Sequence, residues 1–218
     1  LSIAPGERVV IVGKESAFNI RYGFAATPSF VIGTFDKNLS NSGERLKLSL
    51  GAGTEIRDFE YKTNLPWPTI ADGGDRSLVY IAVPGALLDP TITDSWRAGI
   101  SSGGSPGLGE SSSFAGDPNG DDDGDGLANL IEYGAPDGLK LSITADGLAQ
   151  LSYRRVLAAD DVLIQIESET NLQFWEPLDT AYLLVDETFS SDGTSHRTYQ
   201  SSSPVTAKEF FRIKAVIR

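Results

Sequence analysis

The segment from Asp121 to Glu132 has the residue types and spacing of a calcium-binding loop. Counted from its first residue, oxygen-bearing side chains occupy positions 1, 3, 5, 9 and 12, namely Asp121, Asp123, Asp125, Asn129 and Glu132. Position 6 is Gly126, which permits a sharp turn, and position 7 is Leu127, which would offer its backbone carbonyl. Calcium takes six to eight oxygen ligands at about 2.3–2.6 Å, and a loop of the EF-hand type supplies them at these positions. The spacing therefore predicts calcium binding.

A plain acidic linker is the alternative interpretation of the same segment. Residues 110–137 contain eight acids and no Lys or Arg, and runs of like charge with Gly, Ser and Pro usually stay disordered. The spacing of the acidic residues distinguishes a calcium-binding loop from a plain linker. A register that starts at Asp117 fails, because Asp122 falls where Gly is needed and Ala128 falls where Glu is needed. Since one register fits and its neighbour does not, the pattern favours a metal site.

A helix is expected on only one side of the loop. "LANLIEY" (127–133) predicts a short helix that leaves the loop, with Gly134 as its stop. "GESSSFAGDPNG" (109–120) has no helical apolar stripe, so no entering helix is expected, and no second loop of this spacing occurs. Such a single loop with an exit helix resembles the calcium repeats of dockerins and of thrombospondin type 3 modules. The resemblance implies a structural joint instead of a sensor.

Composition excludes several function classes. The chain of 218 residues has a net charge of −12, and its 18 basic residues are scattered, so nucleic acid is not an expected partner. No apolar run approaches the roughly 18–20 residues of a membrane span. The absence of Cys excludes disulfides and thiolate chemistry. The absence of Met leads us to expect a mature or excised piece of a longer protein.

Short strands with turn residues between them make up the rest of the chain. In the first half we expect a helix at 16–22 and strands at 7–12, 30–35, 44–50, 55–61 and 76–83. After residue 138 we expect strands at 139–143, 148–154, 161–168, 181–189, 196–201 and 210–218, with a hairpin turn at "TADG" (144–147). The predicted class is all-β, with two antiparallel β-sandwiches at 1–109 and 139–218. The acidic segment 110–138, with its loop and short helix, would join them.

The first half resembles a bacterial lamin-tail domain. In "PWPTIADGGDRSL" (66–78) the residues that correspond to the W…ADG…SL signature of that family are Trp67, Ala71, Asp72, Gly73, Ser77 and Leu78. "ESETNLQFW" (167–175) and "EFFRI" (209–213) are similar to segments of a small C-terminal β-domain that follows a calcium loop in large exported proteins of Planctomycetes and Verrucomicrobia. The resemblance implies an immunoglobulin-like first domain with an attachment role and no catalytic residues.

One feature departs from the family. Its first strands, with an "NEI…EFIEL" pattern, have no counterpart before Leu1. The apolar segment "ERVVIV" (7–12) would then lie at an open sheet edge, which exposes unpaired backbone groups. We therefore expect a second copy of the chain to cover this edge, in preference to a rearranged segment or an edge that stays exposed.

Other candidate residues have simpler explanations. His196 is the single histidine and lacks a "GxSxG" elbow, so a surface strand position is favoured over a catalytic triad. Trp67 and Asp72 are candidates for sugar binding, although packing in the core is the favoured role of Trp67. Asp72 and Asp75 would also suit a second cation, but a turn rich in Asp and Gly explains them without one.

The sequence as a whole predicts a non-catalytic, calcium-stabilised attachment or spacer region of a secreted or cell-surface bacterial protein. Expected partners are upstream domains of the same polypeptide and a cell-surface polysaccharide or protein. A carbohydrate-binding module of an extracellular enzyme is the alternative, and a hydrolase that uses clustered carboxylates is a more remote one.

Overall fold

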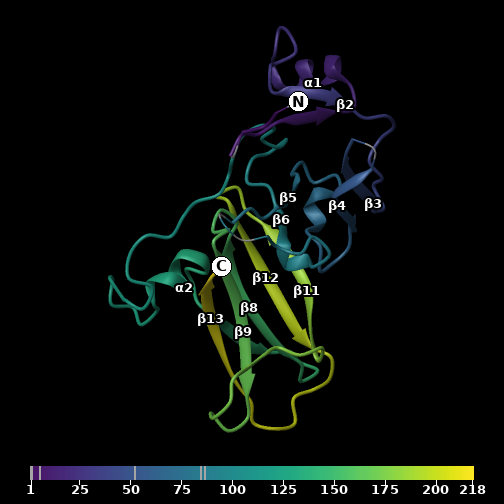
Figure 1. Cartoon of the computed structure of the whole chain (residues 1–218). Helices are drawn as coiled ribbons and strands as arrows, with labels where there is room; N and C mark the ends of the chain where they lie inside the picture. Colours follow the sequence, from purple (N-terminus) through teal and green to yellow (C-terminus); the bar gives the residue numbers. More distant parts are fainter. Residues whose placement is uncertain (1, 5, 52, 84, 86) are drawn as a thin grey trace.

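Strands dominate the computed structural model of the chain, which describes residues 2–4, 6–51, 53–83, 85 and 87–218 (Figure 1). The α-helices of these residues are α1 (Glu15–Tyr22) and α2 (Asn129–Gly134), both near their predicted positions. Two short 3-10 helices, η1 (Thr69–Ala71) and η2 (Thr93–Ser95), lie in the first half. The predicted all-β class is confirmed.

The second half forms two antiparallel sheets. Their strands are β7 (Lys140–Ile143), β8 (Ala149–Val156), β9 (Val162–Glu169), β10 (Glu176–Pro177), β11 (Tyr182–Phe189), β12 (Thr194–Ser201) and β13 (Phe210–Ile217). One sheet has the order β11-β12-β8-β7 and the other has the order β10-β9-β13. Every long strand lies within two residues of its prediction, because alternating apolar residues and turn residues mark both its faces and its ends.

These two sheets share one hydrophobic core. Leu151 and Tyr153 of β8 and Ile166 of β9 are buried in a single cluster with Ala135, which follows α2. Alternate residues of β8 are buried, as the period of a half-buried strand requires. Helix α2 also approaches β9 closely, since a Cβ at Gly134 would lie 2.6 Å from Cδ1 of Ile164. The helix that leaves the acidic loop is therefore anchored on the core of the second half.

The first half consists of three strand pairs. These are β1 (Val10–Val12) with β2 (Val31–Thr34), β3 (Glu44–Leu50) with β4 (Thr54–Tyr61), and β5 (Leu78–Tyr80) with β6 (Trp96–Ala98). The prediction of a purely antiparallel arrangement is wrong for β1 and β2, which pair in parallel. Helix α1 forms the crossover between these strands, and its left-handed cap at Gly23 (φ 76°) turns the chain back. β1 thus pairs on one side within the chain, and no strand of the described residues lies at its other edge.

Aromatic residues hold the strand pairs together. The ring of Trp96 lies 4.9 Å from that of Phe59, 5.1 Å from Tyr80 and 5.7 Å from Trp67, as measured between centroids. These contacts join β4, the η1 region, β5 and β6. A separate aromatic cluster packs α1 on the segment before β2, through Phe18, Tyr22, Phe24 and Phe30.

The predicted linker of residues 100–120 makes specific contacts at its first part. The carboxylate of Glu110 accepts hydrogen bonds from the Ile100 amide at 2.8 Å, the Ser101 amide at 3.1 Å and the Ser105 hydroxyl at 2.7 Å. The amide of Ser112 donates to the carbonyl of Ala158 at 2.8 Å. This stretch is therefore bound to both halves, and the domain boundaries stay a prediction.

Candidate metal centre

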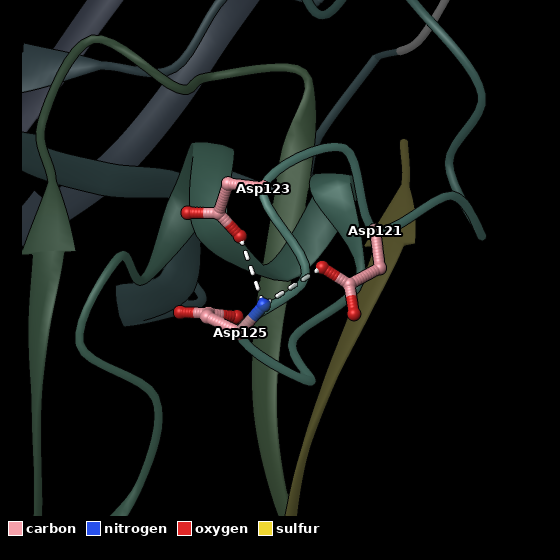
Figure 2. Close-up of side chains that lie close together, drawn as sticks. All are labelled: Asp121, Asp123 and Asp125. Atoms are coloured by element: carbon pink, nitrogen blue, oxygen red, sulfur yellow. Dashed lines mark hydrogen bonds between the residues drawn. The ribbon is translucent and has the colours of Figure 1, made fainter.

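Three aspartates of the acidic loop lie together, as Figure 2 shows. One carboxylate oxygen from each of Asp121, Asp123 and Asp125 lies within 4.8 Å of the others. All three side chains are exposed to solvent. Carboxylate oxygens in this arrangement are the donors that a hard cation prefers. The cluster could hold a metal ion.

Backbone amides of the loop fix the position of these carboxylates. Asp121 accepts hydrogen bonds from the amides of Gly124 at 2.8 Å, Asp125 at 3.1 Å and Gly126 at 3.0 Å. The amide of Asp125 also donates to Asp123 at 3.1 Å (Figure 2). Gly126 takes φ +94°, the left-handed conformation that its predicted turn position requires. The loop is therefore wound so that its alternate carboxylates lie close together.

Asn129, assigned to the water-bridged ninth position, braces the loop. Its Oδ1 accepts from the amide of Asp122 at 3.1 Å, and its Nδ2 donates to the carbonyl of Asp117 at 3.0 Å. Its own amide donates to the carbonyl of Gly120 at 2.8 Å. A Cβ at Gly120 would lie 2.7 Å from the Nδ2 atom, so a larger residue there would shift the Asn129 side chain. These bonds connect both ends of the loop at the start of α2.

Glu132 lies on α2 and outside the group of three clustered carboxylates. Partial desolvation raises the pKa of Glu132, and the neighbouring carboxylates raise it further, in the order Asp123, Asp125, Asp121 and Asp122. The Glu132 carboxyl group thus lies in the negative field of the loop. A cation in the cluster would reverse that repulsion and draw the carboxylate of Glu132 toward the loop.

Leu127, the expected carbonyl donor, links the loop to the turn after α2. Its amide donates to the Asp125 carboxylate at 2.8 Å. Its side chain packs against Gly138, where a Cβ would lie 3.3 Å from Cδ2 of Leu127. A larger residue at position 138 would disturb this contact.

Sequence reasoning missed the contacts that tie α2 to the second half. The hydroxyl group of Tyr133 donates to the carboxylate of Asp161 at 3.0 Å and lies 2.7 Å from the Ser112 hydroxyl. The other oxygen of Asp161 accepts from the amide of Phe114 at 2.7 Å. Tyr133 directly follows Glu132, but no spacing in the sequence pairs it with a residue 28 positions away.

The remaining candidates lie apart from the loop. Trp67 is 5% exposed and packs on Trp96, so it offers no free face to a sugar ring and is not retained as a ligand-binding residue. Asp72 is exposed and ends η1, where its amide donates to the Thr69 carbonyl at 3.1 Å. Asp75 pairs with Arg21 at 3.1 Å, which explains this carboxylate without a second cation. His196 is an exposed residue of β12.

No protein-family model matches this chain, and neither a curated protein nor a solved structure matches it. The resemblance to lamin-tail and dockerin-like modules therefore stays an expectation from the sequence. In the part of the chain that the structure describes, no helix is long and apolar enough to cross a membrane.

Proposed function

We propose that residues 121–132 bind one calcium ion and form a structural joint within a non-catalytic region. The observation that carries this proposal is the cluster of Asp121, Asp123 and Asp125, whose ligand atoms lie within 4.8 Å of one another. Leu127 would add its carbonyl, Glu132 its carboxylate, and Asn129 would hold the loop closed or reach the ion through a water. An all-oxygen set with an irregular loop suits calcium better than magnesium, which demands near-ideal octahedral geometry.

The ion would act on α2. Binding of Glu132 would fix the first turn of this helix against the loop, and the next residue, Tyr133, donates to Asp161 of the second half. Ala135, directly after the helix, is fully buried in the core of the second half. An ordered loop would therefore limit the motion of residues 113–128 relative to that core.

A joint of this kind suits an attachment or spacer region of a secreted or cell-surface protein. Millimolar calcium outside cells would fill a site of modest affinity, and such sites are typical of extracellular modules. The role in attachment rests on the lamin-tail resemblance and on the acidic, β-rich character of the chain. The carbohydrate-binding alternative loses its first candidate residue, because Trp67 is buried.

Thermal unfolding with calcium and with EDTA tests the joint. A ligand that binds only the folded state stabilises it by mass action, which gives about 1.4 kcal/mol at 1 mM calcium if Kd is about 10⁻⁴ M. For a chain of this size, the melting temperature should fall by about 3–6 °C in EDTA. Glu132→Ala should remove most of that difference. Identical melting of the wild-type chain in both conditions would contradict the proposal.

A further inference from the structure

A cavity of about 690 Å³ lies between α1, the β5–β6 pair and the loop of residues 103–111. Figure 1 shows α1 and β2 at one end of the molecule, beyond β5 and β6. Four arginines line the cavity, namely Arg8, Arg21, Arg76 and Arg97. They come from four separate segments, so the fold gathers them here. Such a concentration of positive charge is unexpected in a chain with a net charge of −12.

The acids of the cavity neutralise two of these arginines. Arg97 pairs with Asp160 at 2.6 Å and with Glu110 at 3.3 Å, and Arg21 pairs with Asp75 at 3.1 Å. The three carboxylates are thereby engaged. Among the described residues, Arg8 and Arg76 have no carboxylate within ion-pair distance, so the lining keeps an excess of positive charge.

Arg76 is held in place by groups that do not cancel its charge. Its Nη1 donates to the carbonyls of Gly99 at 2.9 Å and Ile100 at 2.6 Å, and its Nη2 donates to the carbonyl of Ser190 at 2.9 Å. A guanidinium has five N–H donors, and the described contacts use three of them. Two N–H donors, and a positive charge with no carboxylate at ion-pair distance among the described residues, therefore remain for a ligand at a fixed position.

Arg8 is positioned by a glycine. Its guanidinium lies directly on the backbone of Gly109, where a Cβ would come within 2.6 Å of Nη2 and 3.0 Å of Cζ. Arg8 is exposed and is one of the residues that line the cavity. A planar guanidinium suits a carboxylate or a sulfate ester, which accepts two parallel hydrogen bonds.

Hydroxyl groups complete the lining. Ser105 donates to Glu110 at 2.7 Å, Ser111 donates to Asp160 at 2.6 Å, and Tyr22 donates to the carbonyl of Gly103 at 2.7 Å. Each hydroxyl oxygen keeps its capacity to accept a hydrogen bond. The volume is within the range of about 300–1,000 Å³ of small-molecule sites, whereas a bare inorganic anion would leave most of it empty. The lining thus suits a ligand with one acidic group and several hydroxyl groups.

We propose that this cavity binds an acidic saccharide, whose carboxylate or sulfate ester is held by Arg8 and Arg76. The hydroxyl groups of the sugar would donate to the serine and tyrosine oxygens. This site is independent of the calcium loop and of Trp67.

Calorimetric titration of the whole chain tests the proposal, with trigalacturonate as the acidic probe and maltotriose as the neutral one. EDTA in the buffer keeps calcium from bridging the acidic sugar to the acidic loop. The wild-type chain should bind trigalacturonate with Kd of about 1 mM or tighter. Arg8→Gln should weaken this binding about tenfold or more, the effect of losing a hydrogen bond to a charged group.

Arg57→Gln is the matched control, because it removes the same charge from a residue outside the cavity that bonds only to the carbonyl of Ile56 among its described contacts. It should leave binding unchanged. Gly109→Ala should weaken binding less than Arg8→Gln does, since a methyl group would shift the guanidinium but leave its charge in the cavity. The proposal would be overturned by equal binding of maltotriose, by sulfate alone binding as tightly as trigalacturonate, by equal effects of the two arginine variants, or by no binding.

Discussion

Arg97 and Asp160 form a buried, bidentate ion pair between the two halves of the chain. The Nε atom of Arg97 lies 2.6 Å from Oδ1 of Asp160, and its Nη2 atom lies 2.9 Å from Oδ2. The side chains are 1% and 2% exposed. Arg97 belongs to β6 and Asp160 to the connection between β8 and β9, and Ser111 of the predicted linker also donates to Asp160. The pair therefore fixes three segments to one another.

Loss of one partner of this pair should strongly destabilise the fold. Arg97→Leu leaves the Asp160 charge buried without its cation, and we expect a loss of about 3–5 kcal/mol in the free energy of unfolding. Urea denaturation measures this change. The matched control is Arg45→Leu, because Arg45 pairs with Asp58 at the same distance of 2.6 Å but is 74% exposed. That variant should lose much less stability than Arg97→Leu, because solvent screens an exposed pair. Similar small losses in both variants would contradict this account.

Glu110 should make stability depend on acid pH. Burial disfavours its charged form, but hydrogen bonds from the Ile100 amide, the Ser105 hydroxyl and Ser101 prevail and lower its pKa from 4.5 to about 2. Because the folded-state pKa is the lower one, its stabilisation is present above pH 4.5 and is lost as the pH falls toward 2. A shift of this size corresponds to at most about 3 kcal/mol, and screening by solvent reduces this contribution.

The measurement is the free energy of unfolding between pH 6 and about pH 2, for the wild-type chain and for Glu110→Gln. The variant should be less stable at neutral pH and should lose less stability on acidification. Parallel pH profiles of the two proteins would rule out a stabilising role of the Glu110 charge.

The second half could be predicted from the sequence almost strand by strand. In β8, Ala149, Leu151 and Tyr153 are buried and the residues between them are half-buried, because this strand lies on a shared core. Asp146 and Gly147 mark the hairpin between β7 and β8. The first half could not be predicted as well. β5 and β6 have three residues each, and β6 begins at Trp96, whose contacts are with residues distant in sequence. Tertiary packing determines where such short strands form, and no local periodicity in the sequence predicts them.

The candidate metal site also has one part that the sequence predicts and another that depends on tertiary contacts. Asp121, Asp123, Asp125 and the left-handed Gly126 follow from spacing alone, because a single tight loop fixes their relations. The bond from Tyr133 to Asp161 depends on how α2 packs on the second half, and spacing does not specify the side-chain bonds of Asn129 within the loop. The arginine cavity has no sequence motif, since its four arginines meet only in the folded chain.

Gly134 should be required for the close packing of α2 on β9. A Cβ there would lie 2.6 Å from Cδ1 and 3.0 Å from Cγ1 of Ile164, so a branched side chain would push the helix away. We expect Gly134→Val to cost about 1–3 kcal/mol of stability through overpacking. The double variant Gly134→Val/Ile164→Ala should recover part of that loss. If Gly134→Val is as stable as the wild-type chain, α2 is not tightly packed on the second half.

Calcium titration of two matched loop variants tests the central claim most directly. Asp123→Asn removes a carboxylate of the cluster, whereas Asp122→Asn removes the same charge from a neighbouring position outside it. The wild-type chain and Asp122→Asn should bind one calcium ion with Kd of about 10⁻⁴ M or tighter. Asp123→Asn should bind at least about tenfold more weakly, since one charged ligand is lost. Equal weakening in both variants would indicate a diffuse effect of negative charge, and it would contradict a built calcium site, as would the absence of binding to the wild-type chain.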